Sequence, residues 1–274
     1  MSEPGRLLNH FQDRLRKDQS DGWSSLWETD ESDLWDRGKP SPALIDFVEC
    51  YGRNIFHDMK KDDRCCRLKA LVPIKGCGRG YEVIMLALHG FDAYGLEVSS
   101  KVVDIAKEYA ESQLESPDPS FYGEKRSEYV RGSANFVLGD FFQKNWETNC
   151  GIKDDDKFDL IYDYTFLCAL LPEMRFDWAR RMQDLLKPGG VLVCLEFPLW
   201  KDHQSAGPPW GLDGVYWNLL AEGKDGILTS TPALATRDGT DLKGPFTRLV
   251  HYKPDRSYDQ GRGTDMMSIW RPAS

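Results

Sequence analysis

The sequence predicts an α/β fold in which a mostly parallel sheet is covered by helices on both faces. Short apolar runs of strand length alternate with stretches of helical spacing between residues 68 and 197. These runs are continuously apolar, which is typical of parallel strands buried on both faces. Two further apolar runs near the C-terminus flank a polar, turn-rich stretch and predict an antiparallel hairpin at a sheet edge. We therefore expect seven strands in a single domain, residues 1–274.

The limits of each element follow from the residues between them. Gly90 ends one helix, Ser99 is placed to cap the next, and Pro188-Gly189-Gly190 ends the last. The expected strands are 68–74, 92–98, 135–138, 158–164, 191–197, 246–252 and 264–270, and the expected helices are 42–56, 81–88, 101–114 and 172–186. The stretches 116–132 and 199–244 are rich in turn-forming residues, so we expect both to be insertions.

Composition and charge exclude several classes of protein. Hydrophobic residues make up 41% of the 274 residues and charged residues 29%, as in ordinary globular domains. The 35 Lys and Arg against 44 Asp and Glu give a net charge of −9. A protein with this charge lacks the basic surface that binds nucleic acids and anionic membranes. No apolar stretch approaches the roughly 18 residues of a membrane span, and the N-terminus has no signal-peptide core. We expect a cytoplasmic monomer that acts on a small molecule.

Cysteine and histidine do not predict a metal site. The seven cysteines include the neighbours Cys65 and Cys66 but no C-x-x-C pair, and the five histidines are scattered. We expect reduced thiols and no metal.

A glycine-rich loop between a predicted strand and helix is the most informative local motif. Gly76-Cys77-Gly78-Arg79-Gly80 has the spacing G-x-G-x-G, and Tyr81 occupies the position where a dinucleotide site needs a third small residue. This spacing favours S-adenosylmethionine, which has no phosphate to bind. Glu97 ends the second strand, 21 positions after Gly76, where a carboxylate can accept hydrogen bonds from ribose hydroxyls. The alternative is a plain glycine turn with a solvated Glu97.

Two other strand ends carry candidate binding residues. Asp140 and Phe141 follow the third strand and could meet the edge and the face of an adenine, although Asp also forms turns there. Tyr164 follows the fourth strand, at the sheet edge where open α/β sheets bind ligands. Its alternative role is core packing.

Three groups of residues together resemble the thiopurine S-methyltransferase superfamily. They are Gly22-Trp23-x-x-x-Trp27 with Leu34-Trp35-Asp36-Arg37-Gly38; Tyr162-Asp163-Tyr164-Thr165-Phe166 with Pro172-Glu173-Met174-Arg175 and Leu185-Leu186-Lys187-Pro188-Gly189-Gly190; and Gly207-Pro208-Pro209-Trp210. The sequence is most similar to the branch of plant and fungal thiol and halide methyltransferases. Among fungal members it resembles the enzymes that methylate both thiols of reduced epidithiodiketopiperazines such as gliotoxin.

The resemblance implies a class I, Rossmann-like methyltransferase fold and a set of ligand contacts. The implied S-adenosylmethionine contacts are Trp23, Trp27, Trp35, Gly76, Gly78, Glu97, Asp140, Phe141 and Tyr164. The family usually reads Val-Pro-Gly-Cys-Gly, whereas here Ile74 and Lys75 separate Pro73 from Gly76. These two residues either form a bulge or displace the glycines and weaken cofactor binding.

Thiol methylation makes modest demands on an enzyme. A thiol has a pKa of about 8.5, so thiolate is present near neutral pH and we expect no obligatory catalytic base. We expect residues 1–40 to form a lid over the cofactor and residues 199–244 to form much of the acceptor pocket. Arg175 and Trp210 are candidate acceptor-binding residues, although Arg175 could equally form a surface ion pair. Cys168 lies in an apolar run and is expected to be inert.

Two other functions compete with this interpretation. A halide or thiocyanate methyltransferase would share the cofactor residues and have a smaller acceptor pocket. A non-catalytic, methyltransferase-like binding protein would no longer bind cofactor, because of the altered glycine loop. Nucleic-acid methylation is disfavoured by the charge, and by the position of Pro208-Pro209-Trp210 after the fifth strand, not the fourth. Of the nine tryptophans, we expect Trp146, Trp178 and Trp270 to be structural.

Overall fold

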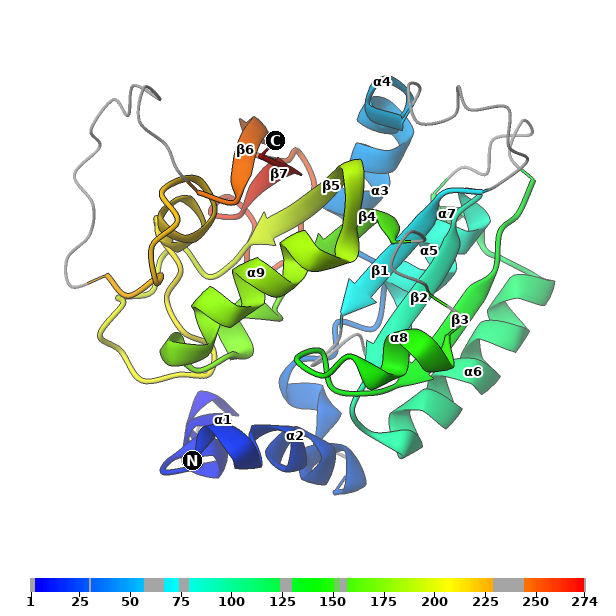
Figure 1. Ribbon diagram of the computed structural model, residues 1–274. Coiled ribbons are helices and arrows are strands. Elements are labelled where there is room, and N and C mark those ends of the chain that lie inside the picture. The colour runs from blue at the N-terminus through cyan, green and yellow to red at the C-terminus, as the bar shows by residue number, and fades with distance from the viewer. Residues whose placement is uncertain are drawn as a thin grey trace.

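A seven-stranded sheet organises the computed structural model (Figure 1). The structure describes residues 3–29, 31–56, 67–73, 79–123, 130–150, 152, 157–228 and 244–273. The strand order is β3-β2-β1-β4-β5-β7-β6, with β1 to β5 parallel and the β6–β7 hairpin antiparallel at one edge. The fold class predicted from the sequence is confirmed.

The seven strands lie close to their predicted positions. Their bounds are β1 Lys69–Pro73, β2 Asp92–Glu97, β3 Ala134–Leu138, β4 Phe158–Asp163, β5 Leu186–Glu196, β6 Phe246–Tyr252 and β7 Met266–Pro272. Strands β1, β2 and β3 pair without a register shift up to their carboxyl ends, where Pro73 lies beside Leu96 and Glu97 lies beside Leu138. The carboxyl ends of β1, β2 and β3 therefore form one continuous edge.

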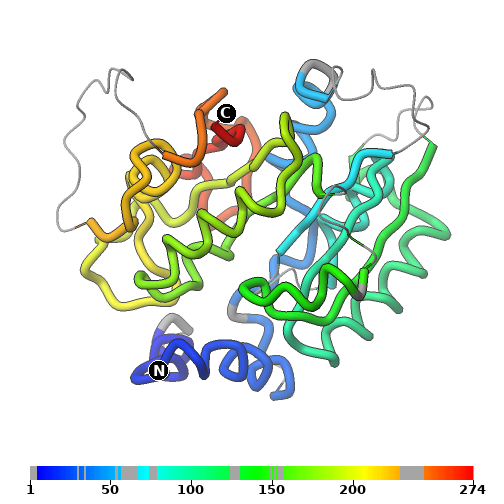
Figure 2. The backbone as a smooth tube through the Cα atoms, in the orientation of Figure 1, coloured from blue at the N-terminus to red at the C-terminus, as the bar shows by residue number. Residues whose placement is uncertain are grey.

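Helices cover both faces of the sheet. Their bounds are α1 Glu3–Phe11, α2 Gln19–Glu28, α3 Pro42–Asp46, α4 Gly52–Phe56, α5 Tyr81–Leu88, α6 Ser100–Glu115, α7 Pro119–Tyr122, α8 Asn145–Asn149 and α9 Arg175–Leu185. Between α3 and α4 the chain forms a π-helical turn, Phe47–Tyr51, so the helix predicted over 42–56 is continuous but irregular. Figure 1 shows α1 and α2 beneath the sheet, on the side toward which β1 points. Figure 2 shows that these helices and the β6–β7 hairpin lie on opposite sides of the molecule.

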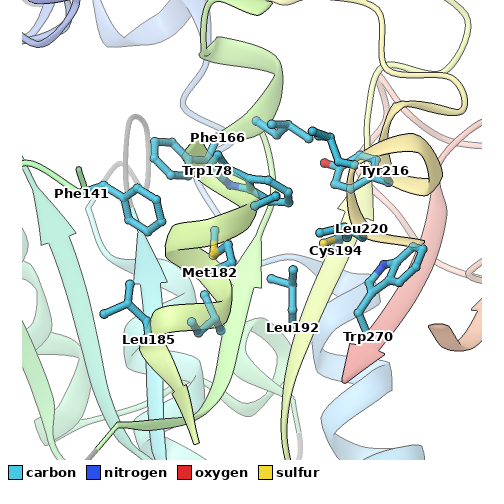
Figure 3. Close-up of a cluster of buried hydrophobic side chains, with 14 of the residues drawn as sticks. Phe141, Phe166, Trp178, Met182, Leu185, Leu192, Cys194, Tyr216, Leu220 and Trp270 are labelled. Atoms are coloured by element: carbon cyan, nitrogen blue, oxygen red, sulfur yellow. The ribbon is translucent and has the colours of Figure 1, made fainter. Parts of the chain in front are cut away.

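The hydrophobic core consists of one cluster on each face of the sheet. Successive residues of β5 alternate between them: Leu192 and Cys194 face the cluster under α8 and α9, whereas Val191 and Val193 face the cluster under α3 and α5. Figure 3 shows the first cluster, where Trp178 lies between Phe166 and Tyr216. The three tryptophans predicted to be structural, Trp146, Trp178 and Trp270, are at most 1% exposed.

Several boundaries differ from those predicted. The last predicted helix, 172–186, consists of a 3-10 turn, Pro172–Met174, followed by α9, and β5 begins at Leu186, so Pro188-Gly189-Gly190 belongs to the strand. Gly189 takes a φ of +84°, which lets the chain bend within this stretch. The loop expected at 116–132 contains α7, and α8 was not predicted. The insertion after β5 contains a π-helical turn, Trp217–Ala221.

Candidate cofactor and acceptor site

The candidate site lies where the chain changes direction in the sheet. From β1 the chain continues to β2 and β3 on one side, and it returns to β4 and β5 on the other. Open α/β sheets bind ligands outside the carboxyl ends of the strands at such a point. The loop after β1 carries Gly76 and Gly78 together with Ile74 and Lys75, and all four lie outside the described residues. Gly80, the last glycine of the loop, has a φ of +81°, and a Cβ there would lie 2.4 Å from the Phe136 ring.

Glu97 is fixed at the end of β2. Its side chain is buried, and Oε1 accepts hydrogen bonds from the backbone N–H groups of Val98 (2.8 Å) and Ser99 (3.0 Å). These bonds hold the carboxylate at the sheet edge. A carboxylate fixed there can accept hydrogen bonds from vicinal hydroxyls.

Asp140 and Phe141 follow β3 on the same edge. Asp140 accepts hydrogen bonds from the N–H of Phe142 (2.9 Å) and from the hydroxyl of Ser20 on α2 (3.3 Å). Asp140 therefore links the N-terminal segment to the sheet. Phe141 is 4% exposed and packs edge-to-face on Phe166 at 5.0 Å between ring centroids.

The three N-terminal tryptophans form one buried aromatic cluster. Trp35 packs edge-to-face on both Trp23 and Trp27, each at 5.4 Å between ring centroids. The cluster also contacts Val102 of α6 and Ala169. The Nε1 atoms of Trp23 and Trp35 are buried and have no hydrogen-bond partner within the described part of the chain. A buried indole N–H usually finds a partner, so a polar ligand group fits here.

Tyr164 lies on the opposite side of the same sheet edge. Its ring stacks on Tyr258 at 5.0 Å between centroids and packs against Phe197 at 5.9 Å. Burial raises the pKa of Tyr164 well above its usual range, so the phenol stays protonated. The chain turns sharply directly after it, where Thr165 has a φ of +61°.

A pocket lies between the N-terminal segment and this edge of the sheet. It is lined by residues 35–37 and 39, the ends of β1 and β4, the start of α5, and Tyr258. Its free volume is about 30 Å³, enough for about two water molecules. A bicyclic dithiol is much larger, so an acceptor of that size would bind outside this pocket.

The two predicted acceptor residues belong to well-packed structures near Cys168. Arg175 is 3% exposed and Nη1 donates to the carbonyl of Gly226 at 2.7 Å, so the surface ion pair considered for it is wrong. Burial lowers the pKa of Arg175 to about 10, which leaves it charged. The backbone N–H of Trp210 donates to the carbonyl of Cys168 at 2.8 Å. A Cβ on Gly207 would lie 2.5 Å from the Trp210 ring.

Cys168 itself is a buried thiol. It is 2% exposed, and burial raises its pKa far above the usual range. This agrees with the expectation that Cys168 is inert, because the nucleophilic form of cysteine is the thiolate.

Sequence reasoning missed Asp163, the last residue of β4. It is completely buried, and its carboxylate accepts hydrogen bonds from Trp178 Nε1 (3.1 Å) and from the Tyr216 hydroxyl (3.2 Å). Burial raises the pKa of Asp163 to about 7. A charged residue within the apolar run 158–164 was the signal that a specific partner exists.

Comparison with known proteins identifies the family. The model of the thiopurine S-methyltransferase family matches residues 18–224. The chain belongs to this family. It is 34% identical over 200 residues to a probable thiol methyltransferase 2 of Arabidopsis thaliana, and the alignment covers 73% of this chain and 71% of that protein. It is 33% identical over 232 residues to a thiocyanate methyltransferase 1 of Brassica oleracea, and the alignment covers 83% of this chain and 85% of that protein.

More distant matches agree with the family and the fold. A thiopurine S-methyltransferase of Pseudomonas fluorescens is 28% identical over 242 residues, covering 85% of this chain and 94% of that protein. A solved structure titled for the conversion of a disulfide bond into a thioacetal group during echinomycin biosynthesis aligns with a TM-score of 0.53 at 17% identity, covering 92% of both chains. The chain is therefore an S-adenosylmethionine-dependent thiol methyltransferase of α/β fold. Among the described residues, no helix is both long and apolar enough to cross a membrane.

Proposed function

We propose that this enzyme methylates the thiols of an apolar small molecule, and specifically both thiols of a reduced epidithiodiketopiperazine such as dithiol gliotoxin. The observation that carries the thiol chemistry is the membership of the thiopurine S-methyltransferase family, together with a ligand site at the point where the sheet changes direction. The choice of a dithiol acceptor rests on the sequence resemblance to fungal thiol methyltransferases.

The cofactor-binding roles belong to this proposal. Glu97 accepts hydrogen bonds from the ribose hydroxyls, Asp140 binds the adenine edge, and Phe141 contacts its face. Backbone at Gly76 and Gly78 approaches the cofactor closely, and Tyr164 contacts its methionine end. Trp23, Trp27 and Trp35 cover the cofactor, and the unpartnered N–H groups of Trp23 and Trp35 support this role. Indole faces also attract a sulfonium by cation–π contact worth about 0.5–2 kcal/mol.

Bound S-adenosylmethionine supplies an electrophilic methyl group. The protein's contribution is to hold the acceptor sulfur in line with that methyl group and to exclude water, which together account for much of the rate increase. Since an acceptor thiol is partly ionised near neutral pH, the thiol proton can leave to solvent before transfer. The buried charge of Arg175 favours the thiolate form of an acceptor bound near it.

The insertion after β5 provides the proposed acceptor surface. Within the part of 199–244 that the structure describes, Trp210 is held against Cys168, and Lys201 Nζ donates to the carbonyls of Ala206 (2.7 Å) and Pro209 (2.6 Å). The Trp210 Nε1 atom is buried and has no partner among the residues described. We expect it to donate a hydrogen bond to an acceptor carbonyl. Trp200 is 62% exposed and is free to contact a ligand from outside.

A smaller acceptor is the second candidate. The Brassica oleracea relative is named for thiocyanate, an anion much smaller than a bicyclic dithiol. The site residues would be the same, and only the acceptor would differ.

One acceptor screen separates the two candidates. Purified enzyme with S-adenosylmethionine is offered reduced dithiol gliotoxin, simple aryl and alkyl thiols, thiocyanate and iodide, and methylated products are measured by mass spectrometry. We expect the highest kcat/KM with the dithiol, with products carrying one and then two methyl groups. Turnover of thiocyanate or iodide alone would establish the second candidate. Glu97→Gln is the control, because it removes the charge that binds ribose and should lower turnover of every acceptor alike.

A further inference from the structure

Among the charged residues that line the pocket at the sheet edge, Arg37 and Glu82 are opposite in sign and have no assigned role. Arg37 comes from the N-terminal segment, two residues after Trp35, and Glu82 lies on the first turn of α5. Both line the pocket between the ends of β1 and β4. A site that presents one cation and one anion is complementary to a zwitterion.

Glu82 lines this pocket, and hydrogen bonds hold its carboxylate in place. It is 7% exposed, and its Oε1 atom accepts hydrogen bonds from the Tyr258 hydroxyl (2.8 Å) and from the N–H of Ser41 (3.1 Å). Both bonds converge on a single oxygen, so they fix the side chain without enclosing it. Burying a carboxylate is costly unless it meets a partner, and these two donors together with the backbone N–H of Glu82 itself offset only part of that cost, so burial raises the pKa of Glu82 to about 7.

Arg37 supplies the opposite charge. The side chain is half-buried, and its Nε atom is buried with no hydrogen-bond partner in the described ranges of the chain. The guanidinium lies near Tyr164 and Asp265, whose titration it influences. Arg37 also has a hydrogen bond with Tyr164. An arginine with an unused Nε–H donor at the wall of a pocket is suited to a carboxylate, because a guanidinium can donate two parallel hydrogen bonds to it.

The position of the pocket identifies which end of the cofactor reaches it. If the ribose is bound by Glu97 at the end of β2, the adenosine lies over β2 and β3, and the rest of the cofactor extends toward the neighbouring strand β1. The pocket lies there, at Val72, Pro73 and the end of β4. The part of S-adenosylmethionine beyond the sulfur is an α-amino acid, with one carboxylate and one ammonium group.

We propose that Arg37 and Glu82 form a clamp for the amino-acid end of S-adenosylmethionine, with Arg37 binding the α-carboxylate and Glu82 the α-ammonium group. This assignment rests on the cofactor roles given above, but not on which acceptor is methylated. The free volume of about 30 Å³ requires the partly exposed Arg37 side chain to turn outward as the ligand enters.

Other charged residues of the pocket are less suited to the two roles. Both carboxylate oxygens of Asp36 have donors, the N–H of Gly38 at 2.8 Å and the Tyr81 hydroxyl at 3.5 Å. Lys39 is exposed, so water competes with its interaction with a carboxylate. Asp36→Asn and Lys39→Gln are therefore matched control variants, each removing the same charge from the same wall.

Calorimetric titration with four ligands tests the clamp without turnover. The ligands are S-adenosylhomocysteine, its decarboxylated analogue, its deaminated analogue, and 5′-methylthioadenosine, which lacks both charged groups. We expect the wild type to bind S-adenosylhomocysteine at least tenfold more tightly than either analogue, as hydrogen bonds to charged groups usually achieve. Arg37→Gln should reduce the preference over the decarboxylated analogue to less than threefold, and Glu82→Gln should do the same for the deaminated analogue.

The pattern of affinities separates a ligand clamp from a purely structural role of Arg37 and Glu82. Unchanged affinity of both variants for 5′-methylthioadenosine shows that the adenosine site is intact, whereas equal losses for all four ligands would mean a structural role and overturn the proposal. Loss of discrimination in Asp36→Asn or Lys39→Gln instead would assign the clamp to those residues. If wild-type protein binds none of the four ligands, the cofactor roles fail, which is distinguishable from failure of the clamp alone.

Discussion

Asp163 shows how one buried side chain connects three elements. It ends β4, and its two oxygens accept hydrogen bonds from Trp178 on α9 and from Tyr216 in the insertion after β5. Because the residue is completely buried, burial raises its pKa to about 7, and the two donors and the N–H of Leu167 offset only part of that rise. The insertion after β5 is thus attached to the sheet through a carboxyl whose pKa is raised by burial.

Asp163 makes the stability of the enzyme depend on pH. A carboxyl with a raised pKa binds more protons in the folded than in the unfolded state, so its contribution to stability is complete at low pH and is lost as pH rises toward 7. Glu82, whose pKa burial raises to about 7, acts in the same direction. Between pH 5 and pH 8, we expect the free energy of unfolding of the wild type to fall by on the order of 3 kcal/mol more than that of Asp163→Asn. Urea unfolding at four pH values measures this.

The asparagine variant should fold, because its Oδ1 can accept from Trp178 and its Nδ2 can donate to the Tyr216 hydroxyl oxygen. Asp104→Asn is the control, since Asp104 is exposed on α6 and should leave the pH dependence unchanged. Parallel curves for the wild type and Asp163→Asn would mean that Asp163 titrates in its ordinary range.

At the scale of elements, the Gly207-Pro208-Pro209-Trp210 turn holds the aromatic ring that we propose contacts the acceptor. The Gly207–Pro208 and Pro208–Pro209 peptide bonds are both cis, and the Trp210 ring lies directly over Gly207. We expect Gly207→Ala to displace this ring, because its Cβ would lie 2.5 Å from it, and to lower kcat/KM for the thiol acceptor about tenfold or more. The affinity for S-adenosylhomocysteine, measured by calorimetry, should not change.

Ser205→Ala is the matched control for this turn, because Ser205 is exposed two residues earlier and should leave kcat/KM unchanged. Equal activity of Gly207→Ala and wild type would show that Trp210 does not contact the acceptor.

Local pattern was sufficient to predict most elements of the sheet. Each parallel strand is a short apolar run bounded by turn residues, and the residues flanking β1, β2 and β4 gave their ends to within about one residue. The start of β5 could not be predicted, because Pro188-Gly189-Gly190 has the composition of a helix stop and pairs with β4 only through the tertiary structure. The short helix α8 lacks a periodic apolar pattern long enough to recognise.

At the scale of the whole molecule, the sequence predicted the residues of the candidate site that lie at strand ends. It did not predict the contacts of the site with residues far away in the sequence. Glu97, Asp140 and Tyr164 follow recognisable strands, so topology alone brings them to one edge. In contrast, Tyr258 reaches the pocket from the connection between β6 and β7, 176 positions after Glu82, to which it donates a hydrogen bond. Contacts of this kind leave no local signal in the sequence.

The N-terminal segment is attached to the rest of the molecule through several polar contacts, three of which involve α2 or the turn before it. Arg16 pairs with Asp177 on α9, Ser20 donates to Asp140 after β3, and Lys101 Nζ on α6 donates to the carbonyl of Trp27 at 3.0 Å. The segment also packs on Val102 of α6 and on Ala169 through its own small cluster of buried apolar residues, which is much smaller than the two clusters on the sheet, so we expect the segment to open more readily than the sheet. A cofactor bound beneath Trp23 and Trp35 would add contacts that oppose this opening.

We therefore expect S-adenosylhomocysteine to slow amide hydrogen exchange in α2 at least tenfold while leaving β4 and β5 unchanged. Lys101→Met should speed exchange of α2 in the free protein and weaken the binding of S-adenosylhomocysteine several-fold, since it removes the hydrogen bond from Lys101 to the carbonyl of Trp27. Lys107→Met, which changes an exposed residue of the same helix, should do neither. Hydrogen exchange measured by mass spectrometry follows both effects. If the ligand binds with normal affinity and protects Glu97 and its neighbours but not α2, then the N-terminal segment is a structural cap of the sheet and not a lid over the cofactor.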